Sequence, residues 1–181
     1  MKKLLLSFAL VVAFLSTLKA QILPVDAKTG KVTYIEVVDA AGMTAKDLFK
    51  AAKDWGVAKG LEVKKEDEAT GEIVFAGKMP VDYTGMKGKA EKGIINYSFS
   101  IFIKDGKYRF IATDFIHEGV GSDPSGGKLE AVSPVCGPGR MSSSTWLMIK
   151  KRTSSGMDAI VADLKRVIKE IQNDPAKKTD W

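Results

Sequence analysis

The stretch IINYSFSIFIKDGKYRFIATDFIH, residues 94–117, decides the fold because it carries the clearest secondary-structure pattern in the chain. Two alternating runs of apolar and polar residues flank Asp105-Gly106, a dipeptide typical of a two-residue hairpin turn. A turn of this length fixes the register of the two strands. The register pairs Ile103 with Tyr108, Ile101 with Phe110, Phe99 with Ala112 and Tyr97 with Asp114. The sequence therefore predicts a long antiparallel hairpin.

One face of this hairpin is almost wholly apolar, because side chains alternate along a strand and the paired residues above share a side. Each buried Ile or Phe contributes about 1.5–3 kcal/mol, so the face must be covered. Asp114 is its exception, and we expect a hydrogen bond to the hydroxyl of Tyr97 to satisfy it. The opposite face is mixed, as on a sheet surface toward solvent. It carries Asn96, Ser98, Ser100, Phe102, Arg109, Ile111, Thr113 and Phe115.

The remaining elements follow from local patterns. Strand-forming residues predict further strands over 31–38, 61–66 and 72–79. Two amphipathic helices are expected, each beginning at a capping-box pattern. The first runs from Thr44 to Gly60, and the second begins at Ser155 and ends at Asn173-Asp-Pro175. The order β-α-β-β-β-β-α predicts an α+β domain with the two helices on one face of an antiparallel sheet.

Residues 1–20 have the pattern of a secretory signal peptide. Lys2 and Lys3 precede an apolar run over 4–15 that is too short to span a bilayer. We expect cleavage before Gln21, a periplasmic or secreted location, and no transmembrane segment after the signal is removed. The remainder, 21–181, has the length of a single domain.

The charge of the chain does not favour nucleic acid as a partner. The sequence has 28 basic and 22 acidic residues, a formal net charge of +6. Three of the lysines lie in residues 1–20, so half of that excess leaves with the signal. Apart from the short run Lys150-Lys151-Arg152, the remaining basic residues are interspersed with acidic ones and form no phosphate-binding stripe.

Catalytic patterns are weak. Cys136 and His117 are the only cysteine and histidine, and together they allow a hydrolase with a thiol nucleophile and an imidazole base. No local signature supports this pair. In SPVCGPGRMSSSTW, residues 133–146, the cysteine has the surroundings of a half-buried small hydrophobe. We expect His117 to be a surface residue at a strand end.

No metal or cofactor site is expected. One histidine cannot build a multi-histidine metal site. The stretch GSDPSGGKL, residues 121–129, departs from the spacing of a phosphate-binding loop and has Leu129 where the metal-binding hydroxyl should stand. It lies in a long Gly/Pro/Ser-rich connection expected over 118–152.

Two stretches resemble a known family. LPVDAKTGKVTYIEVVDAAGMTAKDLFKAAKDW, residues 23–55, and YSFSIFIKDGKYRFIATDF, residues 97–115, are similar to small exported bacterial domains of unknown function. Their fold is like that of the TATA-binding protein (TBP), a curved antiparallel sheet backed by helices. The resemblance covers most of 23–117, extends loosely to the last helix and leaves out 118–152. It implies a TBP-like sheet of about five strands and an export route, but no activity, and shape alone does not imply DNA binding.

Three classes of function stay open. The first is a non-enzymatic envelope or secreted binding module whose partner is an unknown protein or envelope component. Its candidate binding residues are Phe102, Arg109, Ile111 and Phe115, because large apolar groups beside an arginine can anchor a partner. The 118–145 loop is a second candidate surface. The other classes are a hydrolase built on Cys136 and His117, and a structural part of a larger envelope assembly.

Overall fold

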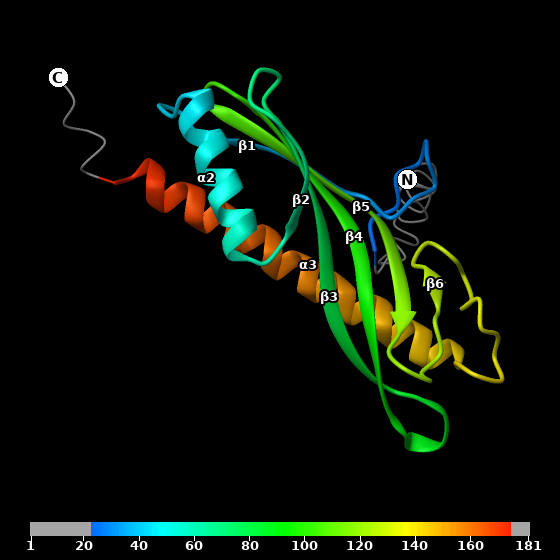
Figure 1. Ribbon diagram of the computed structural model, residues 1–181. Helices are drawn as coiled ribbons and strands as arrows, with labels where there is room; N and C mark the ends of the chain where they lie inside the picture. Colours follow the sequence, from blue (N-terminus) through cyan, green and yellow to red (C-terminus); the bar gives the residue numbers. More distant parts are fainter. Residues whose placement is uncertain (1–22, 175–181) are drawn as a thin grey trace, which may run out of the picture.

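The structure is a computed structural model that describes residues 23–174 (Figure 1). Its elements are β1 (Tyr34–Asp39), α2 (Ala45–Ala58), β2 (Glu62–Asp67), β3 (Glu72–Thr84), the 3-10 turn η1 (Met86–Gly88), β4 (Ala90–Lys104), β5 (Lys107–Gly119), β6 (Gly127–Lys128) and α3 (Ser143–Gln172). The expected order β-α-β-β-β-β-α is confirmed, with the short β6 in addition. The expected signal peptide over 1–20 lies outside the described residues.

All strands join one curved antiparallel sheet in the order β1-β5-β4-β3-β2 (Figure 1). The short β6 pairs with the end of β5. The register predicted from Asp105-Gly106 is confirmed near the turn, where Ile103 pairs with Tyr108 and Phe99 with Ala112.

Both helices pack on the same face of the sheet, which we call the inner face. The ring of Trp55 in α2 lies 5.5 Å from that of Phe99 in β4. The ammonium of Lys165 in α3 lies 6.0 Å from the centroid of the Phe110 ring in β5. Phe99 and Phe110 point to one side of the sheet, so the expected placement of two helices on one face is confirmed.

The helix α3 begins earlier than predicted. Its N-cap is Ser142, whose hydroxyl accepts a hydrogen bond from the N–H of Thr145 at 3.1 Å. The predicted start at Ser155 is therefore wrong, and the connection shortens from 118–152 to 120–142. Although α3 has 30 residues, neither it nor another helix within 23–174 combines the length and apolar character needed to cross a membrane.

The pattern at Ser155-Gly156 is explained by close packing and not by a helix start. Gly156 lies in the middle of α3, where a Cβ atom would come within 2.4 Å of the sulfur of Met79. The glycine lets the helix approach strand β3 at this point. A residue that usually weakens a helix is thus kept here by tertiary packing.

A β-bulge interrupts the hairpin at Asp114. The register shifts between Asn96 and Ser98, so two residues, Asp114 and Phe115, lie opposite the single Tyr97. Asp114 has φ +58°, a conformation that aspartate tolerates better than most residues. The predicted contact between Asp114 and Tyr97 is wrong, since Asp114 is exposed and ion-paired to Lys31 at 2.6 Å.

Candidate binding face

The structure brings three of the four candidate residues together on the sheet face opposite the helices, the open face. Phe102 in β4 pairs with Arg109 in β5, and Ile111 follows two positions later on the same side. The guanidinium carbon of Arg109 lies 4.7 Å from the centroid of the Phe102 ring, within reach of a cation–π interaction. The arginine and the aromatic ring therefore form one unit.

Strand β1 adds two residues that the sequence did not single out. Ile35 pairs with Ile111 and Val37 pairs with Arg109. Their side chains are 58% and 59% exposed, which is unusual for two large aliphatic residues on one short strand. We refer to these five residues as the open-face cluster, namely Ile35, Val37, Phe102, Arg109 and Ile111. Their grouping depends on the pairing of β1 with β5, which is distant in sequence.

Phe115 does not belong to this surface, and its expected place on the open face is wrong. The bulge at Asp114 reverses the alternation, so Phe115 points to the inner face and is fully buried. Its ring stacks on Tyr97 with the centroids 5.6 Å apart, and it meets Tyr34 edge-on at 5.7 Å. Phe115 is a core residue.

Three basic residues, Arg109, Lys104 and Lys107, lie at the hairpin end of the open-face cluster. Among residues 23–174, no carboxylate forms an ion pair with Arg109. Its guanidinium group instead lies over the ring of Phe102. A hollow of about 320 Å³ lies beside this pair and is also lined by Val37, Lys104 and Lys107. The face thus combines apolar side chains with an arginine that is open to a carboxylate.

His117 is buried, and the prediction that it is a surface residue is wrong. It is 0% exposed and lies edge-on to the rings of Tyr83 and Trp146, at centroid distances of 5.4 and 6.0 Å. Its Nδ1 accepts a hydrogen bond from the N–H of Gly126 at 2.9 Å. Burial lowers the pKa of His117 to about 4, although the nearby Glu118 opposes this effect.

The pair Cys136 and His117 does not have the geometry of a nucleophile and its base. Nδ1 of the imidazole is already an acceptor, so the proton of the neutral ring lies on Nε2. Nε2 is buried and has no hydrogen-bond partner among the described residues. Cys136 is a free, half-buried thiol that packs against the core. Its surroundings are those of a small hydrophobic residue.

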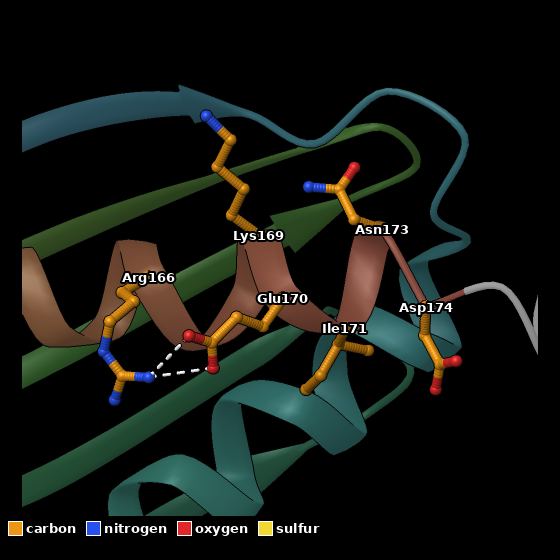
Figure 2. Close-up of a pocket in the computed structure, with 6 residues that line it drawn as sticks. All are labelled: Arg166, Lys169, Glu170, Ile171, Asn173 and Asp174. Carbon is orange, nitrogen blue, oxygen red and sulfur yellow. Dashed lines mark hydrogen bonds and ion pairs between the residues drawn. The ribbon is translucent and has the colours of Figure 1, made fainter.

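Another hollow, of about 630 Å³, lies at the end of α3 and is lined only by residues of the last turns, Arg166–Asp174 (Figure 2). Figure 2 shows Lys169 and Asn173 pointing to one side of the helix and Arg166 and Glu170 lying along it. A guanidinium nitrogen of Arg166 lies 2.8 Å from both carboxylate oxygens of Glu170. Lys169 and Asn173 diverge from the paired Arg166 and Glu170, so these lining residues offer no convergent set of binding groups.

Comparison with known proteins agrees with the fold. Residues 34–118 match a family described as a domain of unknown function (DUF4468) with TBP-like fold. No curated protein matches the chain. A crystal structure of a TBP-like protein from Parabacteroides distasonis ATCC 8503 superposes with a TM-score of 0.61 and 18% identity, over 82% of this chain and 98% of that one.

A second crystal structure, of a DUF4468 family protein from Bacteroides ovatus ATCC 8483, has a TM-score of 0.55 and 15% identity, and the match covers 80% of this chain and 90% of that one. At these identities the two structures show a shared fold and nothing about activity. The α+β architecture, with a curved antiparallel sheet and two helices, is thus TBP-like. The segment 34–118 is therefore similar to DUF4468, a domain of unknown function with a TBP-like fold.

Proposed function

We propose that this chain is an exported, non-enzymatic binding module of the cell envelope or the secreted fraction, which holds a partner protein on the open-face cluster. The observation that carries the proposal is the pair of exposed aliphatic residues, Ile35 and Val37, beside an arginine that forms no ion pair with a carboxylate of residues 23–174. A sheet face without helices can present such residues to a partner. Buried aromatic and arginine anchors supply most of the energy at protein interfaces.

The chemistry of the cluster defines the partner. Its apolar residues would be covered by aliphatic or aromatic side chains. Arg109 is held over the ring of Phe102, so its guanidinium group is oriented before binding and can donate hydrogen bonds to a carboxylate. The neighbouring Lys104 and Lys107 add positive charge at the hairpin tip. The partner surface is therefore expected to be apolar with at least one Asp or Glu near its centre.

The hydrolase alternative gains no support from the geometry. Cys136 has no hydrogen bond to His117, and the acceptor nitrogen of the imidazole is occupied by the N–H of Gly126. Activation of a thiol needs an adjacent base or positive charge. The open-face cluster is the better candidate for the functional surface.

Substitutions in the cluster test the proposal. Arg109→Glu and Phe102→Ser should each reduce capture of partner proteins from native envelope extract by about tenfold or more, the effect expected of an interface hot spot. Quantitative mass spectrometry of the captured proteins measures the change. Lys151→Glu, which reverses an exposed charge on α3, is the matched control and should capture like the original chain.

Circular dichroism should show that the three variants keep the fold, because the substituted side chains are not part of the core. If both cluster variants and the control capture the same proteins in the same amounts, the open face is not the recognition surface. A loss in all three variants would instead indicate a nonspecific effect of charge, and would also contradict the proposal.

Export is tested separately. We expect the protein isolated from its native cell to begin at or within a few residues of Gln21 and to be recovered outside the cytoplasm. The basis is the positively charged start and short apolar run of residues 1–20. Intact-mass spectrometry of the isolated protein gives the N-terminus. A bulk population that begins at Met1 would contradict the prediction.

A further inference from the structure

The two edges of the sheet differ in how they are protected. At one edge lies β2, with the sequence EVKKED, in which five of six residues are charged, and a bulge interrupts it between Val63 and Lys65. Charges and bulges are the usual means of preventing an edge strand from pairing with another chain. At the other edge lies β1, with the sequence YIEVVD, which has no lysine, proline or bulge. With two charged residues, Glu36 and Asp39, against five in β2, β1 is the less protected of these two edges.

The direction of the backbone groups in β1 follows from two hydrogen bonds at its ends. The N–H of Ala40 donates to the carbonyl of Gly106 at 2.8 Å, on the β5 side. The N–H of Thr33 donates to the carbonyl of Pro24 at 2.9 Å, on the outer side. The N–H and C=O groups of successive residues point to alternate sides along a strand. In β1, the N–H and C=O groups of the odd-numbered residues therefore point away from β5. The outward groups of three residues have no partner within 23–174, namely Ile35, Val37 and Asp39.

We propose that β1 pairs antiparallel with β1 of a second copy of this chain, about a two-fold axis at Val37. The three residues with free groups are symmetric about Val37, so a two-fold axis there opposes Val37 to itself and Ile35 to Asp39. Each copy offers three N–H and three C=O groups, and this register joins all of them in six hydrogen bonds. A short hairpin pairs Val25 with Val32, and within 23–174 its pairing ends where the N–H of Thr33 donates to the carbonyl of Pro24.

The side chains favour a second copy of the same chain in this register. On the inner side, Glu36 would face Val38 of the other copy, so no like charges oppose each other across the axis. The carboxylate of Glu36 is neutralised by Lys165 of its own α3 at 2.6 Å. A groove of about 450 Å³ runs between β1 and α3 and is lined in part by Tyr34 and Val161.

The pairing places both open faces on the same side. A two-fold axis perpendicular to the sheet keeps the helices of both copies on the inner side and gives one continuous sheet of twelve strands, six from each copy. The exposed Ile35 and Val37 of the two copies would meet at its centre. The pairing itself does not depend on the partner proposed above.

Solution mass tests the pairing. The purified protein should sediment at twice the monomer mass, and Val37→Lys should sediment at the monomer mass, because two ammonium groups would meet at the axis. Val57→Lys is the matched control, since Val57 is 57% exposed on α2, and it should remain dimeric. A wild-type protein that stays monomeric at every concentration tested overturns the proposal, as does a Val37→Lys variant that stays dimeric.

A cross-link tests the register. In an antiparallel pair that exchanges two hydrogen bonds, the Cα atoms lie about 5.5 Å apart, within the range of a disulfide. Val37→Cys in a Cys136→Ser background should therefore form a disulfide-linked dimer on mild oxidation, while Val57→Cys in the same background should not. A wild-type dimer without this cross-link would show that the copies meet elsewhere, and would overturn the proposed β1 pairing.

Discussion

Replacing Phe115 with alanine is expected to lower the free energy of unfolding by about 3–5 kcal/mol, the range measured for large aromatic residues in protein cores. The side chain is fully buried and stacks on Tyr97 while meeting Tyr34 edge-on. Truncation would remove these contacts and leave a cavity in a sheet that cannot collapse around it. Urea unfolding monitored by circular dichroism measures the loss.

Phe102→Ala is the matched control for this prediction. The same side chain is lost, but Phe102 lies only partly buried on the open face and contacts Arg109. We expect a loss of about 1 kcal/mol or less, typical of a surface position. Losses of about 3–5 kcal/mol in both variants would place Phe102 in a second core layer and contradict the proposed binding role of the open face, whereas losses of about 1 kcal/mol or less in both would contradict the core position of Phe115.

Acidification is expected to destabilise the protein by about 3 kcal/mol through His117 alone. The pKa of this imidazole is about 4 in the folded state and 6.5 in the reference state. Between these values the unfolded chain binds the proton and the folded chain does not. The stabilisation is therefore complete above pH 6.5 and is lost as the pH falls toward 4.

The measurement compares unfolding free energies near pH 7 and pH 4.5 for the original chain and for His117→Phe. The phenylalanine ring fills the same space but does not titrate, although it leaves the N–H of Gly126 without its acceptor. The variant should be less stable at pH 7 and should lose less stability on acidification, because only carboxylates then contribute. Parallel pH profiles for the two proteins would show that His117 is not buried in its neutral form.

The parts of the fold that sequence reasoning predicted correctly depend on short-range signals. The register near Asp105-Gly106 is set by the turn itself, and the paired runs on each side have strict alternation. The helix after Thr44 begins at a capping residue whose hydroxyl accepts the N–H of Asp47 at 3.1 Å. Such features involve residues a few positions apart, so the sequence contains nearly all the information that determines them.

The parts that could not be predicted depend on contacts between distant segments. The bulge at Asp114 is one extra residue in an otherwise regular run, and nothing in the local pattern marks it. Gly156 makes the sequence around Ser155 resemble a helix start, although it lies inside α3. The glycine leaves room for Met79 of β3. In both places tertiary packing overrides a local preference.

The candidate site was predicted in part for the same reason. Phe102, Arg109 and Ile111 lie on the turn side of the bulge, where the alternation holds, and the structure brings them together. Phe115 lies beyond the bulge and was assigned to the wrong face. The contribution of Ile35 and Val37 required the pairing of β1 with β5, a contact across more than seventy residues of chain.

The length of α3 has a mechanical consequence. Near one end, the hydroxyl of Thr145 donates to the carbonyl of Thr84 at 3.0 Å, and at the other the amide of Gln172 donates to the carbonyl of Ala41 at 2.8 Å. These anchor points are separated by about 40 Å of continuous helix, at 1.5 Å per residue. We expect the part of the sheet within 23–174 to resist bending between these two anchor points. A partner that docks on it would therefore move the domain as a rigid body, and force applied at one end would reach the other without bending it.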